Sequence, residues 1–216
     1  MATLLHLDTS ISGESSHSRA VTAAFRKAWE AEHPEGTVIY RDLAAEPVPH
    51  LDAAAYSTGG TAPDERSPEE RAAFELRGRL IEEAERADVI LIGAPMYNYS
   101  IPSTLKAWLD QVFLVGRTAI AENPSLAGKR AVVVASRGGS YREGTPQFGN
   151  DYVENYLRLI LADVFGMDVS FITPELTFAP HVPAMAELVP LFEASRADSL
   201  VTAESLAKEL AVQLVA

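Results

Sequence analysis

Residues 88–110 read DVILIGAPMYNYSIPSTLKAWLD, and this stretch decides the fold. Its first part, 88–94, is so uniformly apolar that both faces of the strand it predicts should be covered, as in the middle of a parallel sheet. Pro95 ends the apolar run, and Pro102 directs the chain toward a helix expected over 103–113. The stretch therefore indicates a central strand, a loop and a covering helix.

Short apolar runs alternate with longer amphipathic stretches in the rest of the chain. This alternation predicts an α/β protein with one doubly wound, five-stranded parallel sheet, in the flavodoxin-like order 2-1-3-4-5, and helices on both faces. No repeat or linker divides the chain, so we expect a single domain over 1–216, with an irregular surface excursion at 44–66. Strands are expected at 3–8, 37–43, 88–94, 130–139 (with its exit loop) and 168–174, and helices at 18–33, 67–87, 103–113, 150–165 and 198–215.

Composition restricts the function. The chain has 18 basic and 30 acidic residues, a net charge of −12, and no concentrated basic patch, which argues against nucleic acid and anionic membranes as partners. It has no cysteine, so thiolate chemistry is excluded and any redox chemistry requires a cofactor. Residues 1–10 lack the features of a signal peptide, and no segment is long and apolar enough to span a membrane, so we expect a cytoplasmic protein.

Ligands of such sheets bind beyond the carboxyl ends of the strands, and the loop at 8–20 is the first candidate. Its hydroxyl side chains lie between a strand and a helix start, where free amides favour a phosphate. It lacks the patterns of triphosphate and dinucleotide loops, so a monophosphate fits better. Simple capping of the helix by serines explains the loop equally well.

Two further loops follow the third and fourth strands. After the third, Met96 and Tyr97 offer polarizable and aromatic surface, and the Asn98 amide suits the edge of a heterocycle. Taken alone, an ordinary strand-to-helix turn explains them better. After the fourth strand, the glycine pair at 138–139 lets the backbone approach a planar ligand, beside an arginine that suits either the surface or an anionic cofactor.

Together, a phosphate end, an aromatic wall and a rim of amide donors match flavin mononucleotide (FMN). The sequence resembles the FMN-dependent NADH azoreductases, also described as NADH:quinone oxidoreductases. The resemblance spans most of the chain to about residue 174, and it is carried by TSISGESSHS (9–18), RDLAAEPVPHLD (41–52), APMYNYSIPSTLKAWLD (94–110) and SRGG (136–139). Tyr99 stands where Phe is usual, and 175–190 does not match closely.

The resemblance implies one FMN per subunit and assigns its contacts. The phosphate end falls to Ser10, Ser16, His17 and Ser18, the isoalloxazine ring to Met96, Tyr97, Asn98 and Tyr99, and the opposite ring edge to Ser136, Arg137, Gly138 and Gly139.

The resemblance also implies a ping-pong reaction. NADH or NADPH delivers hydride to flavin N5 and leaves, and a quinone or an azo compound then takes two electrons, an azo bond needing two rounds. No acid–base residue is strictly required, although the amides of Gly138 and Gly139 are placed to stabilise the reduced ring. Relatives are homodimers with FMN near the interface. Trp108, Val112, Phe113 and Leu114 fit either that contact or, slightly better, the helix core.

Other classes of function remain open at this point. A flavodoxin that carries single electrons to partner proteins also suits the fold and the acidity. A hydrolase using Ser16 and His17, or another serine with His6, His50 or His181, is disfavoured because no nucleophile elbow occurs. The histidines are scattered, so no metal site is expected. The sequence leaves the nicotinamide donor, the acceptor and the substrate-pocket residues within 44–66 and 175–190 undecided.

Overall fold

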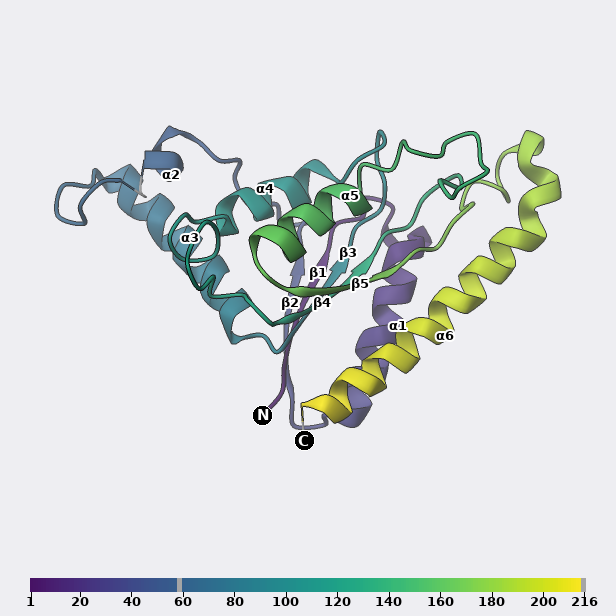
Figure 1. Ribbon diagram of the computed structural model, residues 1–216, viewed down its shortest axis with the longest axis horizontal. Coiled ribbons are helices and arrows are strands. Elements are labelled where there is room, and N and C mark those ends of the chain that lie inside the picture. Colours follow the sequence, from purple (N-terminus) through teal and green to yellow (C-terminus); the bar gives the residue numbers. More distant parts are fainter. Residues whose placement is uncertain (58–59, 215–216) are drawn as a thin grey trace.

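The structure is a computed structural model that describes residues 1–57 and 60–214 (Figure 1). Within these residues, one parallel sheet has the strands Thr3–Asp8 (β1), Thr37–Asp42 (β2), Val89–Gly93 (β3), Arg130–Val134 (β4) and Asp168–Ile172 (β5). The helices are His17–Glu32 (α1), Ala53–Ser57 (α2), Pro68–Arg86 (α3), Ser103–Val112 (α4), Glu154–Leu157 (α5) and Val189–Gln213 (α6). Short 3₁₀ turns cover Gly13–Ser15 and Pro183–Leu188, and a π-helical segment covers Arg158–Val164.

The strands lie in the order β2-β1-β3-β4-β5, and every neighbouring pair is parallel. The expected order 2-1-3-4-5 is therefore confirmed. The winding of the chain changes direction between β1 and β3, which places a topological switch point beyond their carboxyl ends. These ends face the upper side of the molecule in Figure 1, and both chain termini lie on the lower side.

Helices cover both faces of the sheet (Figure 1). α1 and α6 lie on one face, and α3, α4 and α5 lie on the other. In β3, Ile90 and Ile92 belong to the core under α3 and α4, whereas Val89 and Leu91 belong to the core under α1 and α6. Because side chains of a strand alternate between two buried faces, β3 is apolar throughout, as its sequence indicates.

Two helix starts show how local sequence fixes the structure. The hydroxyl of Ser16 accepts a hydrogen bond from the amide of Arg19 and caps α1. Ser67 and Glu70 form a reciprocal capping box at the start of α3, where Pro68 is the first helical residue. Each such cap contributes about 1 kcal/mol to stability, and the predicted start at Ser67 is confirmed.

The core interpretation of the α4 side chains is also confirmed. Trp108 and Val112 are 1% and 0% exposed and belong to the core under α3 and α4. Phe113 and Leu114 are partly buried and pack against the same core. The side chains of Trp108 and Val112 are therefore covered within one chain and offer no surface to a partner.

The last helix is longer than the sequence prediction. The helix expected at 198–215 instead begins at Val189 and ends at Gln213. Pro190 fits its first turn, because an N–H group there has no acceptor within the helix and its absence is tolerated. Residue 215 lies outside the described residues.

The helix expected at 150–165 begins at Glu154 and continues as the π-helical segment. There the amide of Phe165 bonds the carbonyl of Ile160. A turn of this width keeps Leu157, Leu161 and Phe165, spaced four apart and all buried, on one face.

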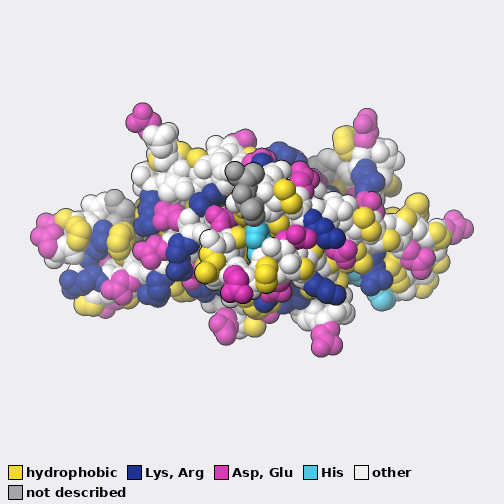
Figure 2. Space-filling view, turned by 90° about the horizontal axis from the view of Figure 1, so that it is seen from below, with side chains coloured by type: hydrophobic (Ala, Val, Ile, Leu, Met, Phe, Trp, Pro, Cys, Tyr) yellow, Lys and Arg dark blue, Asp and Glu magenta, His cyan; other side chains and the backbone are white. Residues whose placement is uncertain are grey.

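Figure 2 shows the molecule from below Figure 1, the side that carries the chain termini. Acidic and basic side chains are interspersed over this face. No described helix is long and apolar enough to cross a membrane.

Candidate functional site

The loops after β1, β3 and β4 meet beyond the carboxyl ends of the strands. A cavity of about 1010 Å³ opens there, a volume at the upper end of the range typical of small-molecule sites. The loop after β1 contributes Ile11 to its wall, α5 contributes Tyr156, and the segment after β5 contributes Phe178. Of the residues predicted from the sequence, those lining this cavity are Met96, Tyr97, Asn98, Tyr99, Gly138 and Gly139.

None of the residues predicted for the phosphate end, Ser10, Ser16, His17 and Ser18, lines this cavity. They belong to residues 9–18, which we call the phosphate loop after the role predicted from the sequence. Ser16 and Ser18 are buried, and their hydroxyl oxygens lie 3.1 Å apart. His17 is the first residue of α1, so the amides of His17 and Ser18 have no acceptor within the helix. Free amides at the positive end of a helix bind anions, and whichever of the two hydroxyls does not donate to the other adds a further donor.

His17 is held against α6. Its imidazole ring makes an edge contact with the ring of Phe192, with centroids 5.3 Å apart. Burial lowers the pKa of His17, and the proximity of Arg196 and His181 lowers it further. Without an anion nearby, the ring is therefore neutral at neutral pH.

The loop after β3 has an unusual backbone. The amide and carbonyl of Tyr97 pair with those of Ser100 at 2.9 and 3.0 Å, which closes a tight turn. Its two central residues, Asn98 and Tyr99, have φ values of 50° and 69°. Residues other than glycine rarely adopt this left-handed backbone conformation, and such strained residues are often found at ligand-binding sites. The turn is thus more specialised than an ordinary link between strand and helix.

Tyr97 joins this turn to the phosphate loop. Its hydroxyl accepts a hydrogen bond from the amide of Ile11 at 3.1 Å and lies 3.2 Å from the hydroxyl of Ser10. The phenol group of Tyr97 is therefore an internal brace between the two loops as well as part of the cavity wall.

Arg137 lies deeper than the sequence suggests. Its side chain is 4% exposed and pairs with Asp151 at 2.5 Å and Glu154 at 2.8 Å. It does not line the cavity, so its visible role is to hold the start of α5 against the loop after β4. Ser136 is also buried, and its carbonyl accepts from the amide of Met96 at 2.8 Å, which joins the loops after β3 and β4.

In the glycine pair the backbone carbonyls are hydrogen-bonded, whereas the backbone amides are available to a ligand. The carbonyls of Gly138 and Gly139 accept hydrogen bonds from the amides of Phe178 (3.2 Å) and Leu176 (3.1 Å). Within residues 1–57 and 60–214, the amides of the two glycines donate to no protein acceptor. The ring of Phe178 lies so close to Gly138 that a Cβ there would be 2.3 Å from its Cδ2 atom. A side chain at position 138 would therefore require the exposed ring of Phe178 to move.

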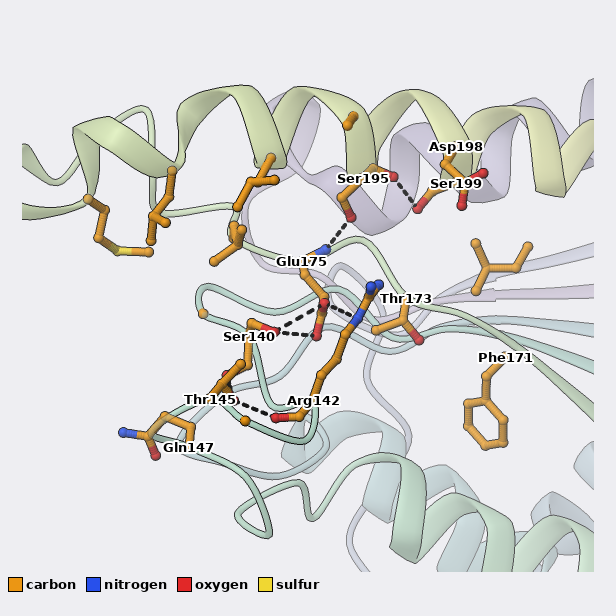
Figure 3. Close-up of a pocket in the computed structure, with 18 of the residues that line it drawn as sticks. Ser140, Arg142, Thr145, Gln147, Phe171, Thr173, Glu175, Ser195, Asp198 and Ser199 are labelled. Atoms are coloured by element: carbon orange, nitrogen blue, oxygen red, sulfur yellow. Dashed lines mark hydrogen bonds and ion pairs between the residues drawn. The ribbon is translucent and has the colours of Figure 1, made fainter.

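Glu175 fixes the far side of this loop. Figure 3 shows it between α6 and the loop at 139–147, inside a second cavity of about 800 Å³. Its buried carboxylate pairs with Arg142 at 2.5 Å and accepts from the hydroxyl of Ser140 at 3.3 Å, and its amide donates to Ser195 on α6 at 3.0 Å. Glu175 thereby ties the loop after β4 to the last helix.

Sequence reasoning did not single out Arg19, and it placed pocket residues within 175–190 without naming Glu175 or Phe178. Glu175 and Phe178 come directly after β5, where the carboxyl-end rule applies, so their position was the available signal. Arg19 follows the phosphate loop, but its contacts reach residues far away in sequence.

The fold and the three-loop cavity define a flavodoxin-like α/β protein with a site for a flat ligand that carries an anionic end. Comparison with known proteins agrees, since residues 2–185 match the family model described as flavodoxin-like fold. A solved azoreductase from Bacillus anthracis str. Sterne superposes with a TM-score of 0.83 at 21% identity, covering 97% of this chain and 100% of that one. An FMN-dependent NADH-azoreductase from B. anthracis str. Ames Ancestor in complex with FMN gives 0.78 at 21% identity, with 96% and 100% covered.

Curated relatives are much closer in sequence. An FMN-dependent NADH:quinone oxidoreductase of Streptomyces coelicolor is 61% identical over 100% of this chain and 98% of its own length. One of Streptomyces avermitilis is 56% identical over the full length of both. The chain therefore belongs to the flavodoxin-like family of FMN-dependent NADH:quinone oxidoreductases.

Proposed function

We propose that this protein is an FMN-dependent oxidoreductase that passes two electrons from NADH to quinones and reductively cleaves aromatic azo compounds to amines. The observation that carries the proposal is the 61% identity, over the whole chain, to an FMN-dependent NADH:quinone oxidoreductase. The solved relatives named as azoreductases support the fold that this activity requires.

The residues present fit FMN. The anionic end suits the first amides of α1 together with the buried hydroxyls of Ser16 and Ser18. The cavity beside it offers a flat ring the side chains of Met96 and Tyr97 and the free amides of Gly138 and Gly139. Ser10 bonds Tyr97 and so connects these two parts of the site, which agrees with a ligand that has a phosphate at one end and a ring at the other.

When bound, FMN supplies the redox chemistry, accepting hydride from the nicotinamide and returning two electrons to the acceptor. The protein supplies binding and electrostatics. The amide of Gly138 shares a peptide plane with the carbonyl of Arg137, which accepts from the amide of Thr177. The amide of Gly139 shares one with the carbonyl of Gly138, which accepts from the amide of Phe178. Donors fixed in this way stabilise negative charge on a ring without reorganisation. Donor and acceptor would use the same cavity in turn, which gives ping-pong kinetics.

A homodimer is the second part of the proposal. Several exposed apolar side chains surround the cavity mouth: Ile11 is 75% exposed, Tyr99 50% and Phe178 59%. Contiguous apolar surface beside a site favours coverage by another protein surface. A second copy of the chain would cover the mouth and exclude water, and sedimentation analysis of the FMN-loaded protein tests this.

An electron carrier of the flavodoxin type is the competing function. A carrier would bind FMN but would need a separate reductase. The decisive assay combines the purified FMN-loaded protein, NADH and a quinone with no other enzyme. The reductase proposal predicts one NADH oxidised per quinone reduced and two per azo bond cleaved; no oxidation of NADH would favour the carrier.

A further inference from the structure

Arg19 lies directly behind the phosphate loop, and nothing in the family resemblance assigns it a role. It belongs to the first turn of α1, and its side chain is 19% exposed. Its Nη2 and Nε atoms donate to the backbone carbonyl of Ser10 at 2.8 and 3.3 Å. Two donors from one planar guanidinium on one oxygen fix that carbonyl in direction as well as position.

The carboxylates of Asp8 and Asp42 lie beside this guanidinium and fix its position. Nη2 also donates to Asp42 at 2.7 Å, at the end of β2, and Nη1 lies 3.7 Å from the carboxylate of Asp8, at the end of β1. The hydroxyl of Tyr40 bridges the group, since it accepts from Nη1 of Arg19 at 3.3 Å and donates to Asp8 at 3.1 Å. Thr22 donates to the other oxygen of Asp8 at 3.0 Å.

This cluster stays ionised at neutral pH. The hydrogen bond from Arg19 lowers the pKa of Asp42, and the reciprocal bond raises the pKa of Arg19. Burial alone would raise the pKa of Asp8, but its contacts with His6, Thr22 and Arg19 outweigh that effect and lower the pKa. With Asp8 and Asp42 beside it, the single charge of Arg19 is fully compensated.

Because its charge is compensated and its nitrogens are engaged, Arg19 does not act by attracting a phosphate directly. It acts through Ser10. The carbonyl of Ser10 is drawn toward Arg19, and on the other side the Ser10 hydroxyl accepts from the amide of Ser12 and bonds Tyr97. The backbone of the phosphate loop is thus held from both sides, in the form that presents its donors at the start of α1.

We infer that Arg19 is a positioning residue that gives this protein its selectivity for a phosphorylated flavin over the same flavin without phosphate. The inference rests on the proposed FMN function and adds the residue that sets the strength of the phosphate contact. Loss of the guanidinium releases the Ser10 carbonyl and removes the cation that faces the carboxylates of Asp8 and Asp42 beside the loop. Both effects weaken binding at the phosphate end and leave the ring end unchanged.

The test compares two ligands that differ only in the phosphate. The full-length apoprotein is titrated with FMN and with riboflavin, following flavin fluorescence, for the wild type and for Arg19→Gln. Losing hydrogen bonds from a charged group costs about 1.5–3 kcal/mol, so the Kd for FMN should rise roughly 10- to 150-fold. The Kd for riboflavin should change less than about 3-fold, because the ring contacts lie on other loops.

Two further variants make the result specific. Arg19→Lys keeps the charge but not the planar fork, so it should still weaken FMN binding, and it serves as the measured variant if Arg19→Gln does not fold. Arg117→Gln is the matched control. Arg117 donates two hydrogen bonds to the carboxylate of Glu85, at 2.8 and 2.6 Å, far from the phosphate loop, and the substitution removes both. It should leave the ratio of the two Kd values unchanged.

The outcomes separate this inference from the proposed function. A wild type that binds FMN at least 10-fold tighter than riboflavin, with that preference lost in the Arg19 variants, supports the inference. Arg19 variants that retain the wild-type preference overturn it while the proposed function stands. A wild-type protein that binds neither flavin overturns both. Equal weakening of FMN and riboflavin would show that Arg19 supports the fold only, and would also overturn the inference.

Discussion

The hydroxyl of Tyr97 accepts a hydrogen bond from the backbone amide of Ile11 at 3.1 Å. This contact joins the turn after β3 to the loop after β1 across the switch point of the sheet. The turn after β3 and the loop after β1 are therefore held together at this point.

Removing this hydroxyl should weaken cofactor binding. Tyr97→Phe keeps the ring but leaves the amide of Ile11 and the hydroxyl of Ser10 without this partner. One neutral hydrogen bond is worth about 0.5–1.5 kcal/mol, so we expect the Kd for FMN to rise roughly 2- to 13-fold in a fluorescence titration. Tyr56→Phe, in the exposed part of α2, is the control and should bind FMN as the wild type does. An unchanged Kd in Tyr97→Phe would contradict the claim that the Tyr97 hydroxyl holds the loop after β1 in its FMN-binding form.

The glycine pair offers a test with an internal control. Gly138→Ala places a Cβ 2.3 Å from the ring of Phe178, whereas at Gly139 the nearest atom is 3.9 Å away, an ordinary contact. We expect Gly138→Ala to lose stability by about 1–3 kcal/mol and to lose FMN affinity, and Gly139→Ala to change little. Adding Phe178→Ala to Gly138→Ala should restore part of the loss, as urea unfolding and FMN titration would show.

Glu175 should support the activity without touching the ring. Glu175→Gln weakens its bonds to Arg142 and Ser140, so the loop that carries the glycine pair is less firmly held. The expected cost is about 1–3 kcal/mol in the free energy of unfolding, together with a lower kcat/KM for NADH. Glu193→Gln, an exposed position on α6, is the matched control. Wild-type stability and kinetics in Glu175→Gln would show that the ion pair does not hold the loop.

Because the pKa of His17 is lowered, we expect the free energy of unfolding to depend on pH. Its pKa is lowered below the ordinary value of 6.5 by burial and by Arg196 and His181, so the folded apoprotein binds this proton less readily than the unfolded chain. The stabilisation is present above about pH 6.5 and declines as the pH falls through that value toward the folded pKa. Urea unfolding of apoprotein at pH 7.5 and about 5.5 should show a smaller decline in His17→Gln than in the wild type. An equal decline in both proteins would place the effect on other groups.

Much of the fold follows from short-range pattern. The apolar run at 88–94 identified a strand buried on both faces, and Ser67 with Pro68 identified the start of α3, because each signal acts over a few residues. The predicted start of the last helix was wrong: α6 begins at Val189, with Pro190 in its first turn, whereas the helix was expected from residue 198.

The site was predictable where one loop carries the signal. Residues 96–99 line the cavity together, as expected from their position after a central strand. The surroundings of Arg137 were not predictable, because its partners Asp151 and Glu154 reach it only when β4 and α5 are packed. Arg19 is similar, since its role depends on carboxylates at the ends of two different strands.

The most direct test of the whole account is an absorbance spectrum of the purified protein after loading with FMN, followed by NADH without oxygen and then by a quinone. The account predicts bound flavin bands that bleach on addition of NADH and return on addition of quinone, with no second protein present. A protein that does not retain FMN, or whose bound flavin is not bleached by NADH, would contradict it.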